Sequence, residues 1–199
     1  MRGRLLTGLV AAGGVIALVG CGTGSAAGQP PVLGQVSASF AVSPIPTVQN
    51  PRDVAAISHR TCELLTPQQA VGFGLDLPPQ QLDGLFGTVR CEWLTTTSDR
   101  GVVRRVGVSV FTNNPTLEVA YSQRGGLPFF ELTQIGGYPA IALRSNADLP
   151  LCDIALKPAE RQSVTVSYRS DEFDNDPQQA CSVGKQVAEA VLMNLPPKS

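Results

Sequence analysis

Apolar and polar residues alternate in four segments of the chain, and each segment predicts a β-strand with one buried face. The apolar positions of these segments are Val89, Cys91 and Trp93; Val106, Val108 and Val110; Cys152, Ile154 and Leu156; and Val164, Val166 and Tyr168. Residues 134–143 include two glycines and a proline, and they predict a fifth strand with a bend near its start. Turn residues at 98–101 and 157–160 are expected to join neighbouring strands as hairpins.

Three helices are predicted, over residues 67–74, 115–124 and 177–195. Thr66 and Asp176 each supply an N-cap oxygen before a proline at the first helical position and a glutamine at the third. Asn114 precedes Pro115 in the same way, without the glutamine. The last helix carries an apolar stripe that must lie on another layer. Its members are Cys181, Gly184, Val187, Ala188, Val191, Leu192 and Leu195.

The order of these elements is a helix, two strands, a helix, three strands and a helix. Such an order is typical of an α+β domain in which helices cover an antiparallel sheet. We therefore expect an antiparallel sheet of about five strands with the helices packed on one face, and two disulfides within the domain.

The first 21 residues follow the pattern of a lipoprotein export signal. Arg2 and Arg4 precede an uncharged apolar run over residues 5–19, which is shorter than the roughly 20 residues of a spanning helix. The run leads into Gly20 and Cys21, and a small residue before a cysteine is what a lipoprotein signal peptidase requires. We expect removal of residues 1–20 and acylation of Cys21. An uncleaved anchor helix, or ordinary cleavage nearby, is the alternative.

Residues 21–52 are rich in Gly, Ser and Pro, and they predict a flexible tether behind the lipidated Cys21. Residues 53–199 are then expected to form a single globular extracytoplasmic domain. A different interpretation of the tether is that residues 32–48 dock on the domain as an edge strand.

Four cysteines remain after Cys21, an even number that suits an oxidising compartment. Four cysteines allow three pairings, and we predict the sequential pairs Cys62–Cys91 and Cys152–Cys181 because each closes one local unit. A metal site is not expected, since the chain has no Cys-x-x-Cys and a single histidine, His59.

Charge excludes one class of partner. The chain has 15 Lys plus Arg against 16 Asp plus Glu, a formal net charge of −1. Without a basic excess there is no field to hold a phosphate backbone, so nucleic acid is not an expected partner.

Several motifs together resemble a known family, the actinobacterial lipoproteins built on an uncharacterised two-disulfide domain, of the LprB and LprC type. The motifs are the lipobox ending at Cys21, Cys62-x-Leu64-Leu65-Thr66-Pro67, Cys91-x-Trp93, Gly137-x-Pro139-Ala140, Cys152, and Cys181 opening a helix that ends at Leu195-Pro196. The resemblance covers nearly all of the mature domain. It implies an exported, membrane-tethered domain of unknown biochemical function and supplies no catalytic residues.

Candidate chemistry is sparse. The Gly-x-Ser-x-Gly turn of serine hydrolases is missing, and His59 lies near the expected start of the domain, where exposure is expected. The acidic residues 171–176 lack EF-hand spacing, and we interpret them as a solvated turn before the last helix. We therefore expect no catalytic residue, no metal and no cofactor.

One apolar run is a candidate contact for a ligand or partner. Leu127, Phe129 and Phe130 follow a pair of glycines and could line a groove or form an exposed patch. The other interpretation is that they fill the core.

The sequence thus predicts a non-enzymatic lipoprotein at the extracytoplasmic face of the cell membrane, held there by acyl chains on Cys21. It would bind a lipid, a cell-wall component or an envelope protein. One alternative is an envelope hydrolase that uses carboxylates such as Asp148 or Asp153. Another is a sensory or structural partner of a second membrane protein.

Overall fold

The computed structural model describes residues 45–84, 88–95, 103–173 and 176–198. The expected signal peptide, Cys21, most of the expected tether and the expected turn at 98–101 lie outside these residues. In the described part of the chain, seven antiparallel strands form one sheet in the order β1-β2-β3-β7-β6-β5-β4. The strands are β1 (Gln80–Asp83), β2 (Val89–Leu94), β3 (Arg104–Phe111), β4 (Phe129–Ile135), β5 (Tyr138–Arg144), β6 (Leu151–Ala159) and β7 (Gln162–Ser170).

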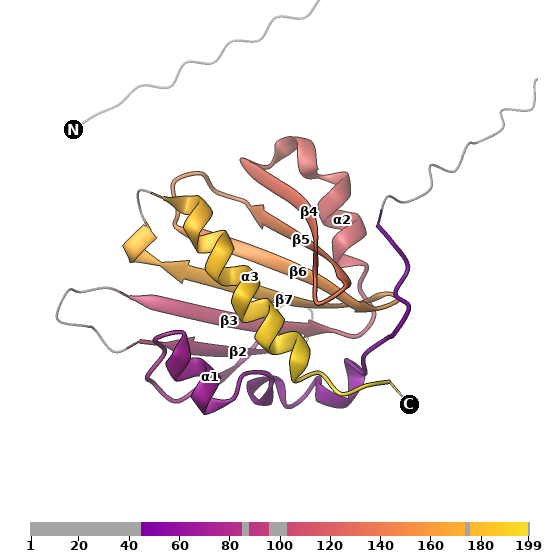
Figure 1. Ribbon diagram of the computed structural model, residues 1–199, viewed down its shortest axis with the longest axis horizontal. Helices are drawn as coiled ribbons and strands as arrows, with labels where there is room; N and C mark the ends of the chain where they lie inside the picture. Colours follow the sequence, from indigo (N-terminus) through magenta and orange to yellow (C-terminus); the bar gives the residue numbers. More distant parts are fainter. Residues whose placement is uncertain (1–44, 85–87, 96–102, 174–175, 199) are drawn as a thin grey trace, which may run out of the picture. The chain divides into compact units, whose positions relative to one another are not determined.

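Three α-helices accompany the sheet in the described residues, namely α1 (Pro67–Gly72), α2 (Thr116–Ser122) and α3 (Pro177–Met193). Short 3-10 helices are η1 (Ala55–Ile57), η2 (Thr61–Leu64), η4 (Arg124–Gly126) and η5 (Asp171–Phe173). The α+β class is therefore confirmed, and α3 runs diagonally across the sheet (Figure 1).

The sheet has two strands more than the sequence predicted. All four residues of β1 are exposed, so it carries no apolar alternation. The segment expected as one bent strand is a hairpin, in which β4 and β5 meet at Gly136 and Gly137. Both glycines have positive φ (55° and 83°), as a tight two-residue hairpin turn requires.

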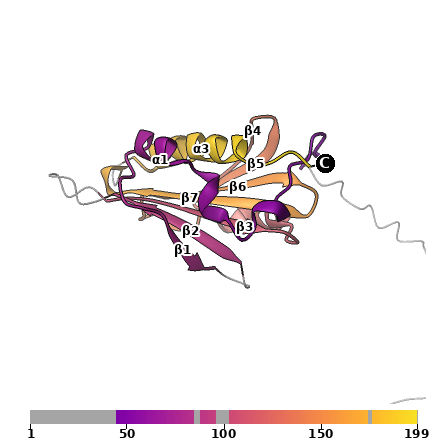
Figure 2. The same ribbon diagram turned by 90° about the horizontal axis from the view of Figure 1, so that it is seen from below.

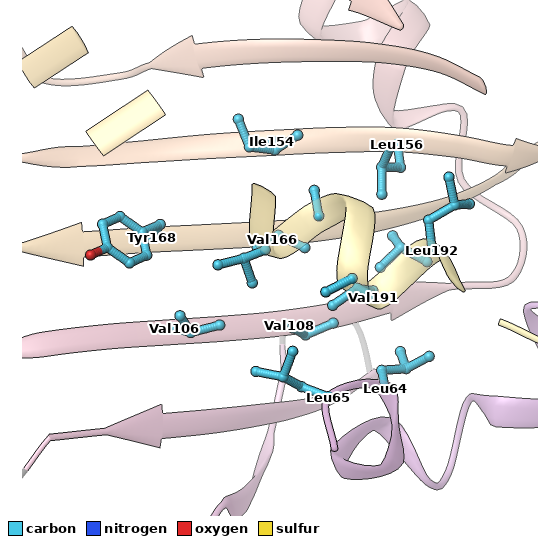
Figure 3. Close-up of a cluster of buried hydrophobic side chains, with 14 of the residues drawn as sticks. Leu64, Leu65, Val106, Val108, Ile154, Leu156, Val166, Tyr168, Val191 and Leu192 are labelled. Atoms are coloured by element: carbon cyan, nitrogen blue, oxygen red, sulfur yellow. The ribbon is translucent and has the colours of Figure 1, made fainter. Parts of the chain in front are cut away.

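The helices lie on both faces of the sheet, which corrects the expectation of one covered face. Figure 2 shows α1 and α3 on the same side of the sheet. The main hydrophobic core lies between them and the sheet. The predicted apolar stripe is buried in it, although α3 ends at Met193 and Leu195 follows the helix. In Figure 3, Val191 and Leu192 of α3 lie against side chains of β3, β6 and β7.

α2 packs on the opposite face over a smaller apolar cluster. That cluster consists of Ile45, Leu117, Ala120, Ile141 and Ala155. Neighbouring residues on a strand point to opposite faces, so Ile154 faces α3 while Ala155 faces α2. The sequence pattern of α2 could not show which face it would cover.

Both predicted disulfides are present. Cys62 of η2 is bonded to Cys91 of β2 with a Cα–Cα distance of 5.1 Å, and Cys152 of β6 to Cys181 of α3 with a Cα–Cα distance of 5.0 Å. Each bond therefore joins the sheet to the layer that lies on its α3 face.

The folded domain begins earlier than residue 53, the expected boundary. Ile45 is 5% exposed within the α2 cluster. Arg52 donates its backbone N–H to the carbonyl of Pro158 (2.9 Å) and forms an isolated bridge with Pro197. Residues 45–52 thus pack on the domain, although they add no strand to the sheet.

Two local predictions are also corrected. The turn expected at 157–160 lies at Glu160 and Arg161, because β6 continues to Ala159 across an irregularity in its pairing. α2 begins at Thr116 after Pro115 and has no side-chain cap, so Asn114 is not its N-cap. By contrast, Thr66 forms the predicted capping box with Gln69, and Asp176 caps α3.

Candidate functional site

The face of the sheet opposite α3 is polar across its middle strands. On β3, Val106 and Val108 are buried in the main core, so the alternating residues Arg105, Gly107 and Ser109 lie on the other face. The register β2–β3–β7–β6 places side chains of the four strands side by side on that face. The row nearest its centre runs from Arg90 through Ser109 and Thr165 to Ala155.

The larger hollow on this face, which we call the main pocket, has a volume of about 440 Å³. Its floor is formed by the sheet, one wall by Asp83 and Gly84 at the end of β1, and another by Thr116 at the start of α2. Phe111, Leu143 and Ala155 give it apolar surface. The remaining lining residues are Arg90, Ser109, Asp153 and Thr165.

A second hollow of about 300 Å³ adjoins the main pocket, and we call it the arginine hollow. It is lined by Arg90, Arg105, Leu151, Asp153, Ser167 and Arg169. Arg90 and Asp153 line both hollows, so they form the boundary between them. A hollow with apolar surface and a hollow lined by three arginines thus lie side by side on one face.

Asp153 is the half-buried carboxyl at this boundary. Its burial raises its pKa, while the hydrogen bond that Ser167 donates to it (2.5 Å) and the charge of Arg90 act in the opposite direction. The burial effect is the largest, so the pKa of Asp153 lies above its ordinary value. A carboxyl with a raised pKa in a pocket is a feature of ligand-binding and catalytic sites.

The three arginines have carboxylate neighbours at the edge of the hollow. Glu92 lies 3.6 Å from Nη2 of Arg90 and 3.8 Å from Nε of Arg105, so one carboxylate is shared by two guanidinium groups. Arg169 pairs with Asp171 at 3.3 Å. Arg105 and Arg169 occupy directly paired positions on β3 and β7.

The α2 wall of the main pocket is held by polar contacts to β6 and β7. Lys157 is only 6% exposed, and its ammonium lies 3.0 Å from a carboxylate oxygen of Glu118 in α2 and 2.9 Å from one of Glu160. The hydroxyls of Thr116 and Ser163 are 2.6 Å apart. These contacts fix the start of α2 beside the pocket.

The apolar run proposed from the sequence does not form one surface. Phe129 packs against the main core on the α3 face, whereas Phe130 packs on the α2 cluster with its ring centroid 6.0 Å from that of Tyr121. Leu127 precedes β4 and is half-buried. None of the three lines the main pocket or the arginine hollow.

The other candidates from the sequence do not gather into a site. His59 and Asp148 are exposed, and neither lines the main pocket. Within residues 45–84, 88–95, 103–173 and 176–198, no group of three or more His, Cys, Asp or Glu side chains is placed to hold a metal ion. The described helices include none that is long and apolar enough to cross a membrane.

Of the residues at the boundary, the sequence singled out only Asp153. Arg90, Arg105 and Arg169 stand at polar positions of alternating strands, and alternation indicates only that such positions face away from the core. Their convergence depends on how β2, β3 and β7 pair, which the sequence pattern leaves open.

The family whose description is "Protein of unknown function (DUF3558)" matches residues 16–194. The chain belongs to this family. The DUF3558 match takes in all seven strands, the three α-helices up to their last residue and both disulfides. No curated protein and no solved structure matches the chain. The function of this DUF3558 domain must therefore be inferred from its own residues.

Proposed function

We propose that this DUF3558 domain is a ligand-binding module of the cell envelope, anchored to the extracytoplasmic face of the membrane through lipid on Cys21. The observation that carries the proposal is the main pocket, about 440 Å³ in volume, in which Phe111, Leu143 and Ala155 supply apolar surface beside several polar side chains. Pockets of this size and lining are typical of small-molecule sites.

The pocket has the properties of a site that is formed before a ligand arrives. Its floor consists of paired strands, and its α2 wall is fixed by the buried Lys157. A preformed site loses little conformational entropy on binding, so little of the binding free energy is offset by ordering the protein. The apolar surface of Phe111, Leu143 and Ala155 favours a ligand with a compact apolar body.

The location is supported by residues outside the described part of the chain. Arg2, Arg4, the apolar run 5–19, Gly20 and Cys21 follow the order of a lipoprotein export signal. The motifs shared with actinobacterial lipoproteins support the same location. Two disulfides agree with an oxidising compartment.

Native mass spectrometry of the exported protein tests the binding function. We expect an additional non-covalent mass that disappears on denaturation. Thr165→Phe places a large ring on the pocket floor and should remove this mass, whereas the near-isosteric Thr165→Val should keep it. Equal loading of the wild type and Thr165→Phe would contradict binding in the main pocket, and would shift the search to a protein partner.

Replacement of Cys21 tests the anchor. Cys21→Ala should accumulate as unprocessed precursor without incorporated lipid, as judged by labelling with a fatty-acid analogue and by gel mobility. Normal processing and labelling of Cys21→Ala would rule out lipidation at this residue.

A second candidate function is hydrolysis by paired carboxylates. The specific observation in its favour is that Asp83 and Asp153 line the same pocket and that the pKa of Asp153 is raised by burial. Two carboxyl groups that face one pocket could serve as acid and base in hydrolysis. An activity against envelope esters or glycosides that disappears in both Asp83→Asn and Asp153→Asn would favour this function over binding alone.

A further inference from the structure

We infer that the ligand of this domain is an anionic amphiphile, whose apolar body occupies the main pocket and whose carboxylate or phosphate head lies in the arginine hollow. The inference rests on the proposed binding function and specifies the ligand class. Its basis is the contiguity of the two hollows, which share Arg90 and Asp153 as lining residues.

The charge of the second hollow selects the head group. Three arginines and one aspartate line it, and the aspartate already accepts a hydrogen bond from Ser167. Guanidinium groups bind carboxylates and phosphates through parallel hydrogen bonds, so three of them around one hollow suit an anion. A cationic head would be repelled by all three guanidinium groups.

Arg105 and Arg169 bring two positive charges to directly paired positions of β3 and β7. Like charges at directly paired positions of an antiparallel ladder destabilise it. Their carboxylate neighbours lie at 3.8 and 3.3 Å, and Glu92 is shared with Arg90. An anionic head bound between these arginines would relieve the repulsion, which gives the arrangement a functional reason.

Arg90 is positioned to contact the part of the ligand that joins head and body. Its guanidinium lies over Gly107, where the absence of a β-carbon leaves room for it, and it borders both hollows. The side chains of Arg90, Arg105 and Arg169 are 31%, 49% and 43% exposed, so an anion from solvent can reach them. The body would follow the sheet surface past Asp153 toward Phe111 and Leu143.

Binding of four octyl compounds to the full-length lipoprotein tests this ligand class. Octanoate, octyl phosphate, octanol and octylammonium share one tail and differ in the head. Isothermal titration calorimetry would use the intact protein in bilayer nanodiscs, with empty nanodiscs as the blank. We expect the two anions to bind at least about tenfold more tightly than octanol, and octylammonium to bind most weakly.

Arginine variants identify the head-group site. Arg105→Gln and Arg169→Gln should each weaken binding of both anions by about tenfold and change octanol binding less than about twofold. Arg60→Gln is the matched control, because Arg60 also forms an ion pair, with Glu63, but lines neither hollow. A larger loss for octyl phosphate than for octanoate would identify a phosphate-bearing ligand, and the reverse a carboxylate.

The outcomes separate this inference from the proposed function. If octanol and octanoate bind equally and the arginine variants change neither, the pocket binds a ligand but the anionic head is excluded. If none of the four compounds binds, and Thr165→Phe matches the wild type, the proposed binding function itself fails. Circular dichroism of each variant confirms that a loss of binding is not a loss of fold.

Discussion

The guanidinium of Arg90 occupies the space that a β-carbon would fill at Gly107 on the neighbouring strand. Gly107 pairs with Glu92, so the arginine reaches diagonally across β2 and β3 from the position of Ser109 to that of Gly107. A residue that weakens a central strand is retained where a side chain needs to approach the backbone closely. The glycine therefore positions the charge that faces Asp153.

Gly107→Ala should displace Arg90 without unfolding the protein, since the obstructed group is the far end of a flexible side chain. Because the charge of Arg90 lowers the pKa of Asp153, its displacement should raise that pKa further. Carboxyl-carbon NMR across a pH titration measures the change directly. Gly125→Ala, where the new methyl group meets no neighbouring atom, is the control. An unchanged Asp153 titration in Gly107→Ala would show that Arg90 exerts no field at that carboxyl.

Asp153→Asn should reduce the pH dependence of stability. Because the pKa of Asp153 is raised in the folded protein, protonation favours folding: this stabilisation is complete below the ordinary value of 3.8 and is lost as pH rises through the folded-state pKa. The uncharged asparagine removes that loss, so its unfolding free energy at neutral pH should equal or exceed that of the wild type. Urea unfolding at several pH values measures it.

Ser167→Ala should increase the pH dependence of stability that Asp153→Asn reduces. The Ser167 hydroxyl donates the hydrogen bond that lowers the pKa of Asp153, so its removal should raise that pKa further. The fall of stability with rising pH should then extend to higher pH. A flatter pH profile in Ser167→Ala than in the wild type would contradict the assignment of this dependence to Asp153.

Loss of either disulfide should destabilise the domain by about 3 to 4 kcal/mol, since each closes a loop with a sequence separation of 29. Paired Cys→Ala substitutions at positions 62 and 91, or 152 and 181, measured by urea unfolding under oxidising conditions, test each bond separately. A change below about 1 kcal/mol would mean that the reduced chain retains structure that already closes the loop.

Lys157→Ala should lower the free energy of unfolding by about 2 kcal/mol, because it removes a nearly fully buried side chain together with its ion pairs to Glu118 and Glu160. Lys185→Ala is the matched control: Lys185 pairs with Glu131 at 2.7 Å but is 30% exposed, so its loss should cost less than about 1 kcal/mol. Equal effects in urea unfolding would mean that burial does not strengthen the Lys157 contacts.

Strong periodic signals gave correct predictions, because they reflect burial by a single layer. The predicted stripe is buried from Cys181 to Leu195, just past the end of α3, and the alternating strands β2, β3, β6 and β7 lie where expected. Weak or absent periodicity explains the two missing strands. β1 is exposed along its length, and β4 sends Phe129 and Phe130 to opposite faces, so neither segment shows one continuous apolar side.

The candidate site was beyond sequence reasoning for a different reason. Asp153 could be named as a carboxylate on a strand, but its environment comes from Arg90 and Ser167, which are far from it in the sequence. Such neighbours are set by strand order, and the chain passes from β3 through α2, β4, β5 and β6 before β7 returns to pair with β3. Local sequence patterns do not indicate that β7 pairs with β3.

Both disulfides join the sheet to the same layer, through Cys62 and Cys181. In the described residues the opposite layer, α2, is held to the sheet by apolar packing, by the ion pair of Lys157 with Glu118 and by the Thr116–Ser163 hydrogen bond, without a disulfide. Substitutions in α2 or around the main pocket can therefore accumulate while the two disulfides hold η2 and α3 in place on the other face of the sheet. On the proposed binding function, such substitutions would change the ligand without a change of fold.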